Sequence, residues 1–233
     1  MLDYLFLPKS RYHKQHRLEL SIIPIKDQIE NCRRNLYLET LPLVMLHSVA
    51  NDVFYPQLMN ILHDLQQRGV VGKWGITTYG LSTPLRAMEH PKIFSFIQIP
   101  FNVLDRLTLS VLESHPNAPK FTFIARSIFL QGLLTKIDNS SSTQLSPLNP
   151  FINSMKKIAT RFDLSLSEIF FRFPAYNLSI GIAIFGTQSL RELRINLSKN
   201  IKGPLNNDII EVIDDILVER IDLLDPRNWQ QNK

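Results

Sequence analysis

The sequence predicts a parallel α/β fold, and two observations support this prediction. Short apolar runs rich in β-branched and aromatic residues recur along the chain, which is typical of strands buried on both faces. Segments with helical periodicity separate the runs, and parallel neighbours need such crossover connections. The five runs are Leu41–Ser48, Val71–Gly80, Ile93–Asn102, Lys120–Ser127 and Ile180–Ser189.

Helical segments fill the gaps between these runs. The first, Pro24–Leu36, places Ile25, Ile29, Cys32 and Leu36 on one face, and its proline suits a first helical turn. The other predicted helices are Val53–Gln67, Ser82–Glu89, Leu104–Glu113, Pro150–Arg161, Ser165–Tyr176, Ser189–Leu197 and Asn207–Ile221. Because strands and helices alternate without interruption, a parallel sheet or barrel is the economical arrangement.

Length and composition are those of one globular domain, and we expect residues 1–233 to form it. Hydrophobic residues make up 44% of the chain and charged residues 20%, which is enough for a sizeable core. The single cysteine, Cys32, excludes an internal disulfide framework and a cysteine-based zinc site, and no metal site is predicted. Because the chain shows neither a signal peptide nor an apolar stretch of about 18 residues, we expect a cytoplasmic protein without membrane contact.

Two segments are predicted to be irregular. Residues 1–20 hold at most one weak strand, Tyr4–Leu7, and a cluster of basic and histidine residues. The cluster is either a solvated loop, which we favour because no binding fold surrounds it, or an arm that binds phosphate or nucleic acid. The segment Thr135–Pro150 is rich in Ser, Asn and Pro, and on a barrel it would hang over the mouth.

Polar side chains close the apolar runs, and the carboxyl ends of parallel strands are where such folds place their chemistry. A neutral imidazole can donate a hydrogen bond to a developing alkoxide, and hydroxyl and amide side chains offer both donors and acceptors. Packed or strand-forming roles for the same side chains stay open. The residues at these positions are His47, Thr77, Thr78, Gln98, Asn102, Arg126, Ser127, Thr187 and Gln188.

Five segments together resemble the aldo/keto reductase family in order and spacing. They read LPLVMLHSVAND, LQQRGVVGKWGITTYG, FIQIPFNVLDR, IARSIFLQGLLT and IFGTQSLRELRINL, and the resemblance runs from about Ile25 to the C-terminus. It implies a TIM (β/α)8-barrel of which about strands 3–8 are present. It also implies reduction of an aldehyde, ketone or sugar carbonyl to an alcohol with NADPH or NADH. The family binds the nucleotide without a G-x-G-x-x-G motif, so the absence of that motif does not argue against nucleotide binding.

The resemblance assigns roles to the strand-end residues. His47 matches the active-site histidine that polarises the substrate carbonyl. Thr77, Thr78 and Gln98 match the positions that bind the nicotinamide carboxamide, although the family usually has Ser and Asn at the first two. Lys9, at the end of YLFLPK, is the candidate for the lysine that assists the catalytic tyrosine.

Further positions match the rest of the nucleotide site. Arg126, followed by Ser127, stands where many members stack an aromatic ring against the nicotinamide, and a guanidinium can stack there too. Glu192 stands where NADPH-binding members often carry an arginine, with Arg191 and Arg194 close by, so the resemblance does not distinguish NADP(H) from NAD(H). The residues that match the segment holding the adenosine end are Gly186, Thr187, Gln188 and Asn196.

The chain lacks the D-x-A…Y-G pattern that carries the catalytic Asp and Tyr in the family. General acid catalysis contributes roughly 10²–10⁴-fold, so the resemblance implies weak or absent activity for this chain. One hypothesis is therefore an N-terminally truncated reductase. Another is a non-catalytic relative that binds a nucleotide or a partner, its open barrel edge completed by a second chain. A third, an unrelated barrel such as a phosphosugar isomerase or lyase, would need strand-end carboxylates or lysines that the chain lacks.

Overall fold

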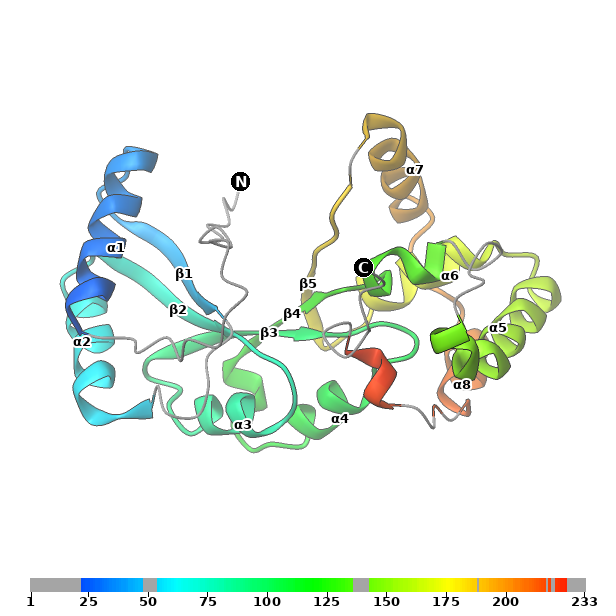
Figure 1. The fold of residues 1–233 in the computed structure, drawn as a ribbon, viewed down its shortest axis with the longest axis horizontal. Coiled ribbons are helices and arrows are strands. Elements are labelled where there is room, and N and C mark those ends of the chain that lie inside the picture. The colour runs from blue at the N-terminus through cyan, green and yellow to red at the C-terminus, as the bar shows by residue number, and fades with distance from the viewer. Residues whose placement is uncertain are drawn as a thin grey trace. The chain divides into compact units, whose positions relative to one another are not determined.

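The computed structural model describes residues 22–47, 54–135, 143–187, 189–216, 218 and 221–225. Strands and helices alternate along them, as Figure 1 shows. The strands are β1 (Leu41–His47), β2 (Val71–Thr77), β3 (Phe94–Pro100), β4 (Thr122–Arg126) and β5 (Ile180–Ala183). They form one sheet in the order β1-β2-β3-β4-β5, and the β1–β2, β2–β3 and β4–β5 pairs are parallel. This confirms the α/β prediction: within the described residues the fold is of the (β/α)8-barrel type, with a linear, unclosed strand order.

Every helix predicted from the sequence is present. The helices are α1 (Ile22–Leu36), α2 (Pro56–Gln67), α3 (Ser82–Met88), α4 (Leu107–Glu113), α5 (Asn149–Arg161), α6 (Leu166–Ala175), α7 (Leu190–Asn200) and α8 (Asn207–Asp214). Four 3₁₀ turns accompany them in the described part of the chain: η2 (Ala118–Lys120), η3 (Leu130–Thr135), η5 (Thr143–Leu148) and η6 (Ile221–Leu224). The segment predicted to be a loop after β4 therefore contains η5. The predicted strand Tyr4–Leu7 and the basic cluster of the first 20 residues lie outside the described residues.

Three boundaries differ from the prediction for local reasons. Helix α4 begins at Leu107, not Leu104, because Asn102 Oδ1 accepts the N–H groups of Leu104 (2.9 Å) and Asp105 (3.1 Å) and holds a turn. Helix α8 ends at Asp214, well short of the predicted end, and the Arg106 guanidinium donates to the carbonyl oxygens of Ile213, in the last turn, and Ile216, just beyond it. Strand β5 has four residues, so most of the predicted run continues as irregular chain.

The described residues form two compact units. The first comprises the described residues up to Gln98 together with Val111–Thr122, and the second comprises Ile99–Ser110 and the described residues from Phe123 onward. Strand β3 contributes residues to both units, because the boundary falls between Gln98 and Ile99.

The core of the first unit centres on Trp74, in the middle of β2. Its indole is 0% exposed, and Nε1 donates to the Leu62 carbonyl of α2 at 2.9 Å. Leu58 and Leu62 of the same helix are also fully buried, so the amphipathic face of α2 covers β2. Helix α1 buries Ile25 and Ile29, but Leu36 is exposed, so the predicted apolar face does not extend to the end of that helix.

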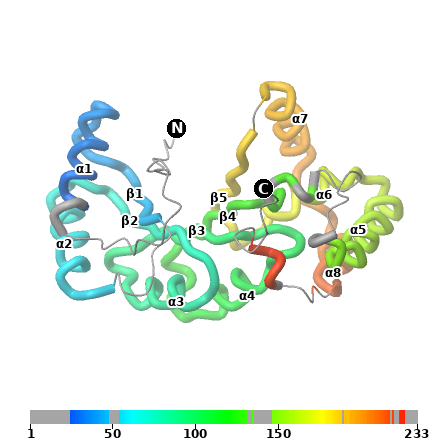
Figure 2. The backbone as a smooth tube through the Cα atoms, in the orientation of Figure 1, coloured from blue at the N-terminus to red at the C-terminus, as the bar shows by residue number. Residues whose placement is uncertain are grey.

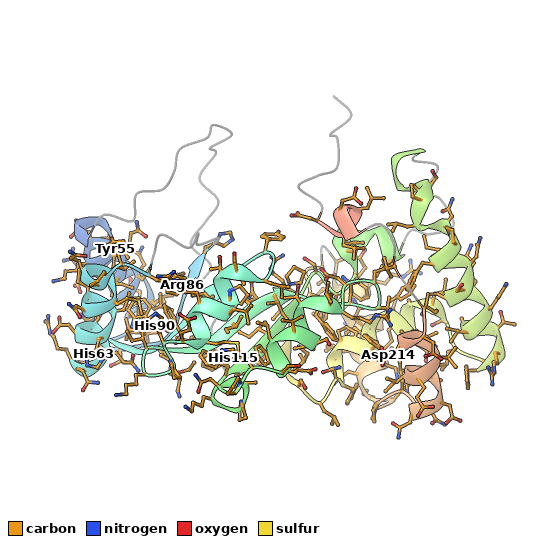
Figure 3. All side chains as sticks on the ribbon, turned by 90° about the horizontal axis from the view of Figure 1, so that it is seen from below. Tyr55, His63, Arg86, His90, His115 and Asp214 are labelled. Carbon is orange, nitrogen blue, oxygen red and sulfur yellow. The ribbon has the colours of Figure 1, made fainter. Side chains whose placement is uncertain are left out.

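An aromatic cluster lies beside this core. The Phe54 ring stacks on His90 with centroids 5.8 Å apart, meets the edge of Phe94, and has the Arg86 guanidinium 5.6 Å from its centroid. Figure 3 labels Arg86 and His90. The cation over the ring and the stacked imidazole together fix the end of α3 against Phe54, which precedes α2.

Helix α6 organises the second unit. Ser165 and Glu168 form a capping box at its start, and Glu168 pairs with Lys202. Arg172 is buried and donates to the Gly203 carbonyl (2.8 Å) and the Pro204 carbonyl (2.7 Å), which lie between α7 and α8. In Figure 2 the backbone leads from β5 into α7 and on to α8. None of the helices that the structure describes is long and apolar enough to cross a membrane.

Candidate functional site

Three strand-end residues of the first unit lie in one row. The strand register pairs His47 with Thr77 and Thr77 with Gln98, so the carboxyl ends of β1, β2 and β3 bring these side chains to the same level. Thr77 Oγ1 donates to Gln98 Oε1 at 3.3 Å, and Thr78 N donates to the Gln98 carbonyl at 3.1 Å. The sequence prediction that these residues share one edge of the sheet is therefore matched by the strand register.

The amide of Gln98 has a donor to spare. The side chain is 1% exposed, and Nε2 has no hydrogen-bond partner among the described residues. Oε1 faces the Thr77 hydroxyl, and Nε2 is the atom directed elsewhere. A buried donor left unpaired costs about 1–3 kcal/mol, so an acceptor supplied by a ligand would recover this free energy.

His47 is the last residue of β1, and its side chain is exposed and engaged with neighbouring groups. Thr77 and Thr78 are buried instead, and Thr78 Oγ1 also donates to the Tyr79 carbonyl at 3.3 Å. The exposed imidazole of His47, the buried threonine hydroxyls and the buried Gln98 amide can together contact one polar ligand at this edge of the sheet.

In the second unit, the end of β4 is fixed by the turn that follows β3. Phe101 N donates to the Arg126 carbonyl at 3.1 Å, and Asn102 Nδ2 donates to the Ser127 carbonyl at 3.1 Å. Arg126 Nη1 lies 3.3 Å from Ser127 Oγ. Ser127 has a positive φ of 55°, a conformation that L residues adopt at a cost and that here sets the exit of the strand.

Asp105, in the same turn, is a titratable residue that sequence reasoning missed. Burial raises the pKa of its carboxyl to about 6; Arg126 opposes this rise and Asp225 adds to it. Asp105 stands three residues after Asn102, a spacing by which the sequence indicates a turn. Its burial beside Arg126 and Asp225 depends on the tertiary structure, so the sequence does not reveal its raised pKa. A carboxyl with this pKa changes charge near neutral pH beside the strand end.

The start of α7 holds a carboxylate. Ser189 Oγ accepts the Glu192 N–H at 3.1 Å, and Thr187 Oγ1 donates to Glu192 Oε2 at 2.9 Å. The sequence predicts free N–H groups here for a phosphate; the Glu192 N–H is already occupied, and the carboxylate is near the positive end of the helix. Gly186 is exposed, and a Cβ added there would meet nothing within 4 Å, so packing does not require this glycine.

One turn further along α7, Asn196 is buried and its Oδ1 accepts from Lys199 Nζ at 3.0 Å. Sequence reasoning named Asn196 but not Lys199. The lysine sits three residues later, which on a helix places it beside the asparagine. Two other predicted site residues, Lys9 and Gln188, lie outside the described residues.

The comparisons with known proteins agree with this architecture. The model of the aldo/keto reductase family matches residues 9–218. The holo form of aldo-keto reductase AKR11C1 from Bacillus halodurans is similar with a TM-score of 0.68 and 18% identity, over 84% of this chain and 69% of that one. The glycerol dehydrogenase AKR11B4 from Gluconobacter oxydans is similar with a TM-score of 0.67 and 19% identity, over 84% of this chain and 64% of that one.

No curated protein matched the chain. At these identities the solved structures establish the fold alone, and the family rests on the match over residues 9–218. The chain belongs to the aldo/keto reductase family.

Proposed function

We propose that this chain binds a nicotinamide dinucleotide at the carboxyl ends of its strands and acts as an oxidoreductase on a small carbonyl compound. Family membership supports the proposal, and one observation carries it: the buried Nε2 of Gln98 has no partner within the described residues. A nicotinamide carboxamide has a carbonyl oxygen that such a donor fits. The nucleotide, when bound, supplies the hydride.

The chain's own residues supply binding and charge stabilisation. Gln98 Nε2 donates to the carboxamide oxygen, and the neighbouring threonine hydroxyls, already oriented by Gln98 and Tyr79, serve its amino group. His47 donates a hydrogen bond to the substrate carbonyl oxygen and stabilises the negative charge that develops there. In the second unit, Arg126 and Ser127 match the family positions for the nicotinamide ring, and Gly186, Thr187, Gln188 and Asn196 match those for the adenosine end.

Protonation of the product oxygen is the weak point of this chain. The sequence has no counterpart of the family's catalytic Asp and Tyr, and we propose Lys9 for the lysine that would assist them. Turnover by this chain is therefore expected to be slow, since a positioned general acid contributes roughly 10²–10⁴-fold. The same observation favours a second candidate function, a relative that binds the nucleotide without reducing a carbonyl.

Thermal unfolding with millimolar NADH or NADPH tests binding. A ligand that binds only the folded state at a hundredfold excess over Kd adds about 2.7 kcal/mol to stability, so the melting temperature should rise by several degrees. Gln98→Ala removes the spare donor and should weaken binding by up to about tenfold. Gln66→Ala, which removes a buried amide of α2 outside the site, should leave the nucleotide-dependent rise unchanged.

Each outcome has a meaning for the proposal. A wild-type melt that neither nucleotide moves would contradict it. A rise in melting temperature without NADH oxidation in the presence of aldehydes, ketones or sugars would favour the binding-only candidate over the reductase.

We further propose that Glu192 makes NAD(H) the preferred nucleotide. Its carboxylate is held by Thr187 at the first turn of α7, the position that matches the arginine of NADPH-binding members. A carboxylate there repels the additional phosphate of NADPH. Glu192→Gln should raise the affinity for NADPH about threefold to tenfold with little effect on NADH, measured as Kd by calorimetry. Glu211→Gln, on α8, is the control, and equal affinity of the wild type for both nucleotides would contradict the proposal.

A further inference from the structure

Lys199 is a buried cation that the proposed binding site does not use directly. It is 7% exposed, and among the described residues its ammonium donates to a single oxygen, Asn196 Oδ1 at 3.0 Å. The Phe129 ring centroid lies 6.0 Å from Nζ. A buried lysine is normally paired with a carboxylate, because leaving its charge without an anion costs free energy. The nearest carboxylate that acts on it, Glu168, forms its salt bridge with Lys202 instead.

This contact decides how the Asn196 amide is turned. An ammonium only donates hydrogen bonds, so the atom facing Lys199 must be the carbonyl oxygen. The NH₂ group is then directed away from Lys199, and within the described residues Nδ2 makes no hydrogen bond. Asn196 as a residue is 9% exposed. A neutral residue at position 199 would not enforce either orientation.

We infer that Lys199 is a positioning residue that fixes the Asn196 amide as a hydrogen-bond donor toward the purine base of the bound nucleotide. The inference rests on the proposed function, in which Asn196 holds the adenosine end. A freely turning asparagine can pair with adenine through both N6 and N7, donating to one and accepting from the other. With Oδ1 engaged by Lys199, Asn196 presents only the Nδ2 donor. This donor can bind the N7 acceptor of any purine and makes no hydrogen bond to the exocyclic group.

The protonation state of Lys199 offers a second line of argument. Burial lowers the pKa of the Lys199 ammonium, and Glu168 on α6 opposes this effect; Lys202, at the end of α7, is bound to Glu168. Once deprotonated, the amine has a lone pair and accepts as well as donates, so it no longer selects the amide oxygen. A preference for adenine over hypoxanthine should therefore appear at alkaline pH, below the ordinary lysine pKa of about 10.4.

The test compares NADH with its analogue that carries hypoxanthine in place of adenine, using Kd from calorimetry. The wild type should bind both within about twofold, because N7 is common to the two bases. Lys199→Met, which keeps an apolar stem of similar length, frees the amide to pair with both N6 and N7 of adenine, so this variant should prefer NADH over the hypoxanthine analogue by about tenfold. Lys199→Arg, which stays charged, should show no such preference at neutral or at alkaline pH.

A second variant separates positioning from folding. Asn196→Asp gives Lys199 a carboxylate partner, so the melting temperature should be kept or raised, yet the donor is lost and NADH binding should decrease about tenfold or more. Equal binding of the two nucleotides by Lys199→Met, or wild-type NADH affinity in Asn196→Asp, would overturn this inference alone. If Lys199→Met fails to fold, Asn196→Asp decides. Failure of the wild type to bind NADH would instead overturn the proposed function, and this inference with it.

Discussion

Replacing Trp74 by alanine is expected to lower the free energy of unfolding by about 3–5 kcal/mol, enough to unfold the first unit in part. The indole is completely buried between β2 and α2, and truncation would remove its packing and leave a cavity. It would also remove the donor to the Leu62 carbonyl. Urea denaturation followed by circular dichroism measures the change.

Trp74→Phe separates the two contributions. Phenylalanine fills most of the space but has no N–H, so its cost should be smaller, about 1–2 kcal/mol. A loss below about 1 kcal/mol for the alanine variant would show that the site relaxes around the cavity and that Trp74 does not organise this core.

Asp105→Asn is expected to stabilise the protein at neutral pH. Burial raises the pKa of the Asp105 carboxyl from 3.8 to about 6, so the folded state holds a proton that the unfolded state releases between these values. Stability therefore decreases as pH rises from about 4 to about 6 and stays lower above this range. The difference corresponds to about 3 kcal/mol as an upper bound, and asparagine, which does not ionise, removes it.

The measurement is the melting temperature of the wild type and Asp105→Asn from pH 4 to pH 8. The two curves should coincide near pH 4 and separate up to about pH 6, with the variant more stable. Asp64→Asn, at an exposed residue paired only with Arg68, should change stability by less than about 0.5 kcal/mol and leave the shape of the profile unchanged. Parallel wild-type and Asp105→Asn curves would show that Arg126 compensates the buried charge fully.

At acid pH, Glu168 makes the stability of the protein increase with pH, opposite to the effect of Asp105. Its pKa is lowered to about 2, mainly by the hydrogen bond from Lys202, so the stability it contributes is present above its ordinary value of 4.5 and is lost as pH falls toward 2. The Glu168 and Asp105 effects together place the most stable pH of the folded chain between about 4 and 5.

The proposed site combines a rigid and a titratable part. The row His47, Thr77 and Gln98 is set by strand register, so its geometry follows from the backbone. The turn that follows β3, with Asn102 and Asp105, lies against the end of β4. Its Asp105 carboxyl changes charge near pH 6. Nucleotide binding to the first part is therefore a cleaner readout than activity, to which both parts contribute.

The elements of this fold could be predicted because local chemistry fixes them. Buried parallel strands need apolar residues on both faces, and each of the five runs contains one of the strands β1 to β5. Helix ends that depend on local signals, such as Ser165 with Glu168 or Pro56 at the start of α2, also follow from sequence. The end of α8 did not, because Arg106, more than a hundred residues earlier, donates to the Ile213 and Ile216 carbonyls on either side of it.

For the candidate site, the sequence by itself determined which residues stand at strand ends, and with them the family. Only the tertiary structure decided how these residues act, because hydrogen-bond partners and burial arise between segments distant in sequence. Gln98 Oε1 accepts from Thr77 while Nε2 is spare, and burial, with Arg126 and Asp225, sets the pKa of Asp105. Lys199 lies within one turn of Asn196, yet its burial depends on the packing of α7 against α6 and Phe129, which no local pattern reveals.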